Sequence, residues 1–193
     1  MRRQEAIEVL ANGRGSAISV ATMQSIVPWH NAGQGEFDHL DAQRCMGSAS
    51  SLGLGLALAV PDRNVFVLDG DGSLLMQLGS LVSIAHARPR NLYHFIFANG
   101  VHETTGNQPL PGAGVFDFCV LATGAGYQGA FSVSTRDEFE EQLPRILDTP
   151  GPVLVNLVID REDDRSAGSA GVPMASQIKA LRKSFGPTDD NSP

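Results

Sequence analysis

Hydrophobic positions along the chain form short β-branched or aromatic runs, and helical patterns separate these runs. The runs typical of strands cover residues 17–22, 64–69, 92–98, 130–134 and 152–159. Three of them are nearly continuous apolar runs, as expected of parallel strands that helices cover on both faces. The helical patterns between them cover residues 47–60, 73–87 and 135–147. This alternation predicts an α/β fold with an open, doubly wound, mainly parallel sheet and helices on both faces.

The patterning divides the chain near residue 160. The last helical pattern before that point begins with Thr135-x-x-Glu138, the spacing of a capping box. After it the periodicity is lost among Asp, Ser, Gly and Pro, apart from one short helical pattern over residues 175–185. We therefore expect one domain over residues 1–160 and a C-terminal tail over residues 161–193. The tail is expected to lie over the domain, to contact a partner chain or to be disordered.

Composition narrows the classes of function. The 193 residues carry a formal net charge of −7 and form no basic stripe, which argues against a nucleic-acid-binding surface. Cys45 and Cys119 have neither metal-ligand spacing nor a disulfide framework, as expected in a reducing compartment. The first residues are charged and helical in pattern, unlike a signal peptide, and the apolar run at 52–60 is too short to span a membrane. These features predict a cytoplasmic protein.

Polar residues follow two neighbouring strands of the predicted sheet. Asp69 ends one strand, and the Gly-Asp-Gly-Ser of residues 70–73 then leads into a helix that is expected to begin near Leu74. The next strand ends at Asn99-Gly100. Free amides at a helix N-terminus bind phosphate, and glycine lets the phosphate approach the backbone.

An aspartate inside an anion site requires a cation between the two negative groups. Mg²⁺ prefers hard oxygen ligands and bridges carboxylate to phosphate oxygens, so Asp71 and the amide oxygen of Asn99 are candidate ligands. The alternative is that Asp71 only caps the helix and that Asn99 only makes a turn. Because parallel strands end at the same edge of a sheet, the two residues together favour a diphosphate–metal site.

The motif resembles that of the thiamine diphosphate enzymes, in the domain that binds the cofactor diphosphate. The family signature is Gly-Asp-Gly, some two dozen residues and then Asn-Asn; here Ala98 replaces the first asparagine. The resemblance implies that the side chains of Asp71 and Asn99 and the carbonyl of Val101 bind Mg²⁺. It implies further that the residues around the diphosphate are Gly70, Gly72, Ser73 and Thr22, with amides from Gly72 and Ser73.

A second stretch, RCMGSASSLGLGLALA, is similar to the family segment that holds the cofactor in a bent form. The resemblance implies that Met46 wedges between the two rings of the cofactor and that the carbonyl of Arg44 orients its exocyclic amine. The alternative for Met46 is an ordinary core residue.

The loop ANGVHETTGNQPLP is similar to the corresponding loop of phosphonopyruvate decarboxylases and of sulfopyruvate decarboxylase β chains. This resemblance implies that His102 and Glu103 are catalytic residues on the substrate side of the cofactor; the alternative is a solvated pair. His86 and His94 are expected to be structural. His30 and His39 lie in segments that the pattern does not place, and either is a candidate for an active site.

Thiamine diphosphate enzymes also need a glutamate that activates the cofactor, and a separate pyrimidine-binding domain supplies it. The resemblance covers about residues 17–160 and only the diphosphate half. It therefore implies a partner chain, within a dimer or hetero-oligomer, and little activity without that partner; Glu36 is the first candidate if the chain carries its own glutamate.

The predicted function is the cofactor-binding subunit of a two-chain 2-keto-acid decarboxylase, a lyase that acts on sulfopyruvate or phosphonopyruvate. The alternatives are a carboligase of the acetolactate synthase type and a non-catalytic thiamine diphosphate-binding module. A plain nucleotide-binding Rossmann protein is disfavoured because no G-x-G-x-x-G follows the first strand.

Overall fold

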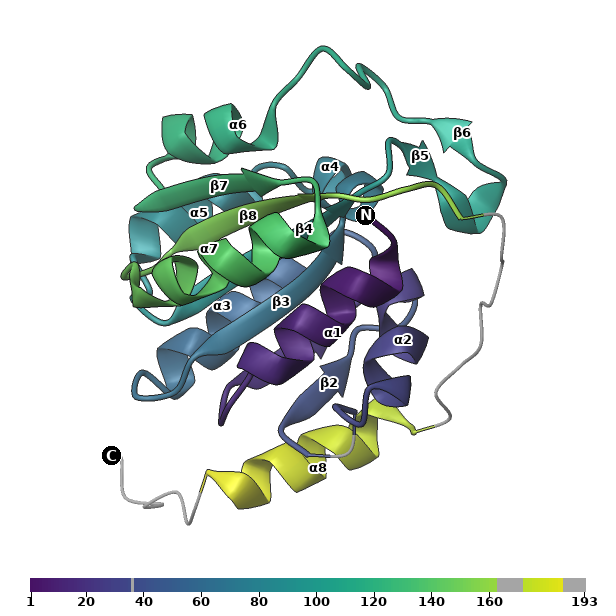
Figure 1. The fold of residues 1–193 in the computed structure, drawn as a ribbon. Helices are drawn as coiled ribbons and strands as arrows, with labels where there is room; N and C mark the ends of the chain where they lie inside the picture. Colours follow the sequence, from purple (N-terminus) through teal and green to yellow (C-terminus); the bar gives the residue numbers. More distant parts are fainter. Residues whose placement is uncertain (36, 163–171, 186–193) are drawn as a thin grey trace.

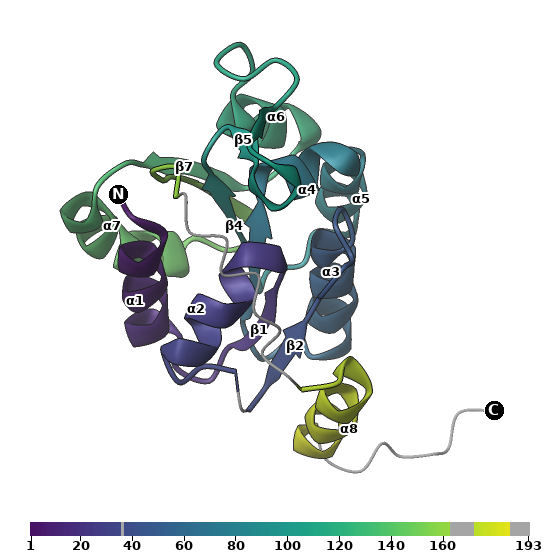
Figure 2. The same ribbon diagram turned by 90° about the vertical axis from the view of Figure 1, so that its right-hand side faces the viewer.

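The computed structural model, which describes residues 1–35, 37–162 and 172–185, contains a six-stranded sheet whose paired strands are all parallel. The strand order is β2-β1-β3-β4-β8-β7, and helices lie on both faces (Figures 1 and 2). The strands are β1 (Ile18–Ala21), β2 (His39–Asp41), β3 (Val65–Gly70), β4 (Leu92–Ala98), β7 (Gly129–Val133) and β8 (Val153–Val158). This architecture confirms the prediction of an open, doubly wound α/β sheet.

The helices divide between the two faces of the sheet (Figure 2). They are α1 (Arg3–Gly13), η1 (Met23–Ser25), α2 (Ile26–Asn31), α3 (Ala49–Ala59), α4 (Asp71–Met76), α5 (Ser80–Ala87), α6 (Phe118–Ala125), α7 (Arg136–Asp148) and α8 (Met174–Ser184). One buried cluster joins Phe66 and Leu68 of β3 to α1, α2 and α7, and the other joins Val65 and Val67 to α3, α5 and α6. Alternate residues of β3 therefore enter opposite cores, which explains its continuous apolar run.

The structure confirms most of the expected elements and corrects two. The expected helix start is confirmed, since Thr135 is the N-cap and its Oγ1 accepts a hydrogen bond from the Glu138 amide at 3.3 Å. The capping box is only half formed, because the Glu138 carboxylate accepts from the Ser134 amide. The helix expected in the tail is α8. The single helix expected over residues 73–87 is wrong. The chain forms α4 and α5 instead, since Gln77 leaves the helical region (φ −140°, ψ 46°) just before Gly79, a weak helix former. The first of them begins at Asp71 rather than near Leu74, directly after the strand.

Helix α6 was not expected from the pattern, and neither were two short elements at the β2 edge of the sheet. Strand β2 has three residues, two of them the polar His39 and Asp41, so no apolar run marks it. Helix α2, which carries His30, has only six residues. Helix α8 packs against β2 at this edge of the sheet (Figure 1).

A small antiparallel hairpin follows β4 at the carboxyl edge of the sheet. It consists of β5 (Val101–His102) and β6 (Gln108–Pro109), joined by η2 (Glu103–Thr105). Gly106 turns the chain with φ +115°, a conformation that favours glycine. The hairpin thus places the residues after β4 beside the ends of β1 and β3. Among the helices of the described segments, none is long and apolar enough to cross a bilayer.

Candidate active site

A cavity lies at the carboxyl edge of the sheet, between the ends of β1, β3 and β4 and the hairpin. Its lining comes from three continuous segments of the chain and from four single residues. The lining residues are Thr22–Ser25, Met46, Gly70–Ser73, Asn99, Val101–Thr105, Arg3 and Phe97. The crevice at the carboxyl ends of parallel strands is where such sheets bind ligands, so this cavity is the candidate active site.

Asp71 joins the two strand ends. Its side chain is 4% exposed; Oδ1 accepts a hydrogen bond from the Gly72 amide and Oδ2 accepts one from the Gly100 amide, both at 2.7 Å. Burial raises the pKa of Asp71, although these amides and that of Asn99 oppose the rise. The carboxylate is therefore held in one orientation, and a cation beside it would favour its ionised form.

Asn99 and Val101 complete an oxygen-rich corner of the cavity. The Asn99 Oδ1 atom accepts a hydrogen bond from the Val101 amide at 3.0 Å, and the Asn99 carbonyl accepts one from Arg161 Nε at 3.3 Å. The oxygen atoms that could serve as metal ligands are those of a carboxylate, a side-chain amide and main-chain carbonyls. These hard oxygen atoms fit Mg²⁺ and do not suit a soft metal.

The first turn of α4 needs its small residues because other segments pack directly on it. A Cβ atom at Gly72 would lie 2.7 Å from His102 Nδ1, so the hairpin rests on the backbone there. Ser73 Oγ accepts a hydrogen bond from the Gly47 amide at 2.9 Å, and Gly47 has φ +81°. This bond fixes the loop that carries Met46 against α4.

The other residues expected at the cofactor differ in whether they line the cavity. Met46 is half-buried and lines the cavity. Thr22 lines it too, but its hydroxyl is within 3.5 Å of the Ala42 carbonyl and is buried. Arg44 is exposed, has φ +60°, and its side chain is not part of the described cavity wall.

Glu103 is buried rather than solvated, and its partner is a residue that the sequence pattern did not indicate. Arg3 of α1 donates from Nη2 to Glu103 Oε2 at 2.6 Å and from Nη1 to Glu162 Oε2 at 3.0 Å. Within the described chain, the second oxygen of Glu103 has no hydrogen-bond partner. The two residues are 100 positions apart, so only the folded chain reveals the pair.

Behind the cavity floor, Asp69 forms a fully buried contact with His94 of β4. Asp69 Oδ2 lies 3.2 Å from His94 Nε2, and Oδ1 accepts a hydrogen bond from the Gly70 amide at 2.9 Å. Both side chains have zero exposed area, so the contact joins the end of β3 to the first half of β4. His86 lies exposed on α5, as a residue away from the cavity.

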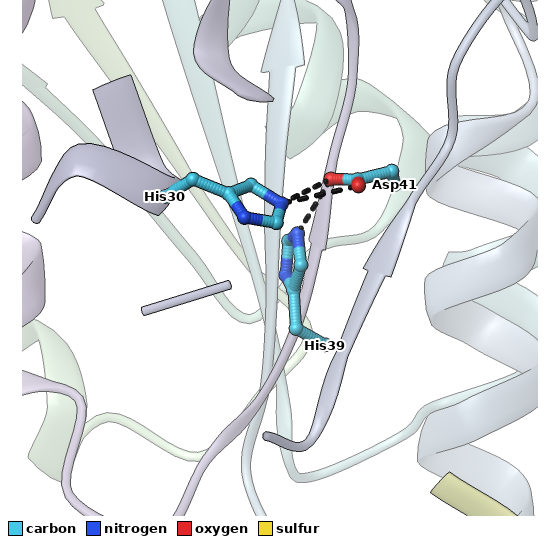
Figure 3. A group of neighbouring side chains, drawn as sticks. All are labelled: His30, His39 and Asp41. Carbon is cyan, nitrogen blue, oxygen red and sulfur yellow. Dashed lines mark hydrogen bonds and ion pairs between the residues drawn. The ribbon is translucent and has the colours of Figure 1, made fainter. Parts of the chain in front are cut away.

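The sequence pattern did not place His30 and His39. The structure places His30 on α2 and His39 on β2 rather than in loops. In the described chain neither lines the cavity. Both contact Asp41 instead, in a separate cluster (Figure 3). Glu36, the candidate for an activating glutamate, lies outside the described residues.

Comparison with known protein families agrees with this architecture. The family model of the thiamine pyrophosphate enzymes, C-terminal TPP binding domain, matches residues 20–157. A solved structure with a similar fold is the thiamine diphosphate-dependent 4-hydroxybenzoylformate decarboxylase of Rhodococcus jostii RHA1. It has a TM-score of 0.68 and 21% identity over 85% of this chain and 33% of that chain.

Curated relatives are more similar in sequence. Phosphonopyruvate decarboxylase of Streptomyces viridochromogenes is 44% identical over 114 residues, which is 59% of this chain and 28% of that enzyme. Sulfopyruvate decarboxylase subunit beta of Methanocaldococcus jannaschii is 40% identical over 102 residues, which is 53% of each chain. The chain thus spans under a third of the first relative and about half of the second.

Proposed function

Because the chain belongs to the family of thiamine pyrophosphate enzymes, through their C-terminal TPP-binding domain, we propose that the cavity holds the diphosphate of thiamine diphosphate through Mg²⁺. The observation that carries this proposal is the arrangement of Asp71, Asn99 and Val101. They come from the ends of two neighbouring strands and line one cavity with hard oxygen donors.

In this proposal the chain contributes a rigid corner for the metal and the diphosphate. Asp71, Asn99 and the Val101 carbonyl are the metal ligands, and the amides of Gly72 and Ser73 face the diphosphate beside Gly70. Two amides already orient the Asp71 carboxylate at 2.7 Å, so little side-chain freedom is lost when a cation binds. The tight packing of His102 on Gly72 keeps the hairpin close to this corner.

We propose that the remaining cofactor contacts come from residues outside this corner of the cavity. Met46 supports the cofactor from the loop that Ser73 anchors, the Arg44 carbonyl orients the aminopyrimidine, and Thr22 contacts the diphosphate. The half-buried position of Met46 in the cavity wall supports its part of this assignment. When bound, thiamine diphosphate supplies a carbon nucleophile and an electron sink for decarboxylation of 2-keto acids.

His102 and Glu103 are proposed to act on the substrate side. The imidazole of His102 lies in the cavity wall and can donate a proton or a hydrogen bond to a bound anion. Glu103 is held by Arg3 at 2.6 Å, so its carboxylate is fixed and partly neutralised rather than free to repel an anionic substrate.

We propose that the substrate is a 2-keto acid with a second anionic group, such as phosphonopyruvate or sulfopyruvate. The names of the relatives, phosphonopyruvate decarboxylase and sulfopyruvate decarboxylase subunit beta, support this class. We propose further that another chain supplies a pyrimidine-binding domain with the activating glutamate, within a cytoplasmic dimer or hetero-oligomer. The word "subunit" in the second name supports a two-chain assembly.

The test is reconstitution of activity with a pyrimidine-domain chain. Release of CO₂ is measured with sulfopyruvate, phosphonopyruvate and pyruvate, in the presence of thiamine diphosphate and Mg²⁺. The expected result is turnover of a substrate with the second anion only when both chains are present, and none with Asp71→Ala. Equal turnover by this chain alone would refute the partner proposal, and carboligation of pyruvate would favour the acetolactate synthase type.

A further inference from the structure

Three metal-binding side chains meet at the β2 edge of the sheet, apart from the cavity. His30 comes from α2, and His39 and Asp41 come from β2 (Figure 3). His39 Nε2 lies 2.8 Å from Asp41 Oδ1, and His30 Nε2 lies 3.0 and 3.1 Å from the two oxygens of Asp41. The two imidazole rings and the carboxylate therefore converge on one point.

The local sequence explains why they converge. His39 and Asp41 are two positions apart on a strand, so their side chains lie on the same face. His30 reaches them from the last turn of α2. A Cβ atom at Gly35 would overlap the His30 ring, so the glycine leaves room for this position of the imidazole.

We propose that His30, His39 and Asp41 form a binding site for a divalent transition metal, with Zn²⁺ as the best-fitting ion. Two imidazole nitrogens and one carboxylate oxygen are a usual set of three protein ligands for zinc. One ligand atom from each residue lies within 4.8 Å of the others. With metal–ligand distances of about 2.0–2.2 Å, ligands in a tetrahedron are about 3.3 Å apart. The observed N–O distances of 2.8–3.1 Å need to widen only by tenths of an ångström.

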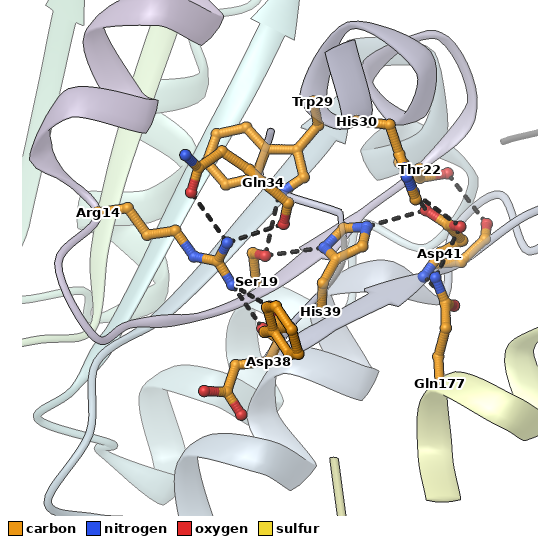
Figure 4. A network of polar contacts seen from close by, with 12 residues as sticks. Arg14, Ser19, Thr22, Trp29, His30, Gln34, Asp38, His39, Asp41 and Gln177 are labelled. Atoms are coloured by element: carbon orange, nitrogen blue, oxygen red, sulfur yellow. Dashed lines mark hydrogen bonds and ion pairs between the residues drawn. The ribbon is translucent and has the colours of Figure 1, made fainter. Parts of the chain in front are cut away.

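Outer partners orient the ligands, as is typical of metal sites (Figure 4). His39 Nδ1 lies 2.8 Å from Ser19 Oγ, which accepts a hydrogen bond from Trp29 Nε1 at 3.0 Å. Asp41 Oδ2 accepts a hydrogen bond from Gln177 Nε2 of α8 at 2.8 Å. With a metal on His39 Nε2, the imidazole proton sits on Nδ1 and Ser19 is its acceptor.

The electrostatics suit a cation. The cluster offers one carboxylate and two imidazole groups, with one ligand atom from each within 4.8 Å of the others. An entering ion would meet His30 first, because its side chain is 18% exposed, whereas those of His39 and Asp41 are 0% and 6% exposed.

A bound metal would add a direct link between elements that already contact one another. It would connect α2 to β2, and through Gln177 it would strengthen the contact of α8 with that strand. The site is independent of the proposed diphosphate site, whose donors are oxygen atoms on β3, β4 and the segments that follow them.

The test is metal binding by the folded protein after removal of metals with a chelator. Calorimetric titration with Zn²⁺ should show one equivalent bound, and Co²⁺ should give the intense visible absorption of a four-coordinate site. His30→Ala should abolish both signals, whereas His86→Ala, which removes an exposed histidine of α5, and Asp71→Ala should keep them. Gln177→Ala should weaken Zn²⁺ binding roughly 10–100-fold, the usual effect of losing an outer partner.

Circular dichroism of each variant establishes that it is folded. If His30→Ala does not fold, the Co²⁺ spectrum of the unmodified protein decides between a four-coordinate site and a hydrated ion. Absence of stoichiometric Zn²⁺ binding, a hydrated-ion spectrum, or equal affinity in a folded His30→Ala variant would each overturn the proposal. In those cases the cluster is a set of hydrogen bonds on Asp41.

Discussion

Replacing Arg3 by methionine should destabilise the protein far more than the same replacement at its neighbour Arg2. Both arginines form an ion pair of similar length: 2.6 Å from Arg3 to Glu103 and 2.8 Å from Arg2 to Glu5. The difference is burial. The side chains of the first pair are each 6% exposed, whereas Arg2 is 69% exposed.

The expected magnitude follows from the charge that is left behind. Removing one partner of a buried ion pair costs about 3–5 kcal/mol, because the other charge stays away from water without compensation. Since a urea m-value is at most about 3 kcal/mol per molar, the midpoint of unfolding should fall by at least about 1 M. Glu162, the other partner of Arg3, is 32% exposed, so water replaces that contact at little cost. Arg2→Met should shift the midpoint by no more than the scatter of the measurement.

The assay is urea unfolding followed by circular dichroism, with the m-value checked for constancy. The second arm is the double variant Arg3→Met/Glu103→Gln. Neutralising Glu103 removes the uncompensated charge, so the double variant should recover part of the lost stability. Equal midpoints for Arg3→Met and Arg2→Met, or a double variant no more stable than Arg3→Met, would refute the reasoning.

Further predictions concern packing, reactivity and substrate choice. In α3, Gly53→Ala should cost about 1–3 kcal/mol because the new methyl group overlaps Val67 of β3. Gly55→Ala, two residues on, should stabilise the protein by up to about 1 kcal/mol, because a Cβ atom there would have no described neighbour within 4 Å. Chemical denaturation of the two variants measures both changes in the free energy of unfolding. Burial raises the pKa of the Cys119 thiol to about 11, so at pH 8 only about one thiol in a thousand is ionised. In a Cys45→Ser variant, reaction with a thiol reagent should be slow at pH 8 and accelerate about tenfold per pH unit until pH 11; a fast reaction at pH 8 would contradict this. If the imidazole of His102 binds the second anion, His102→Asn should raise KM for sulfopyruvate far more than for pyruvate; if it donates a proton, the variant should lower kcat for both substrates. Steady-state kinetics of the assembled enzyme distinguishes the two roles. No change in either constant would remove His102 from the site.

The strong hydrophobic runs made the centre of the fold predictable from sequence. Strands β3 and β4 are buried on both faces, and each contains a continuous apolar run, residues 65–68 and 95–98, so the pattern is unambiguous. Strand β2 has only three residues, two of them polar, and no local pattern marks such an edge strand. The break between α4 and α5 was missed because the apolar residues on either side continue in helical spacing.

Residues that follow neighbouring strands were predictable from the sequence, whereas contacts made by the helices that pack over the sheet were not. Asp71 and Asn99 follow neighbouring strands, and the parallel sheet alone brings them together. Arg3 reaches Glu103 from a helix 100 residues earlier in the chain, and His30 reaches Asp41 from a helix that the pattern did not indicate. Such contacts depend on how helices pack over the sheet, which periodicity does not encode.

The central claim is that Asp71 holds a magnesium-bound diphosphate at the carboxyl edge of β3. Calorimetric titration of thiamine diphosphate, with and without Mg²⁺, tests it most directly. The account predicts binding that requires Mg²⁺, that is lost in Asp71→Ala and that is unchanged in Asp62→Ala, a replacement of an exposed aspartate outside the cavity. Asn99→Ala should weaken binding less, because water can replace a neutral oxygen ligand. Affinity for thiamine diphosphate that is the same in Asp71→Ala as in the unmodified protein would contradict the account.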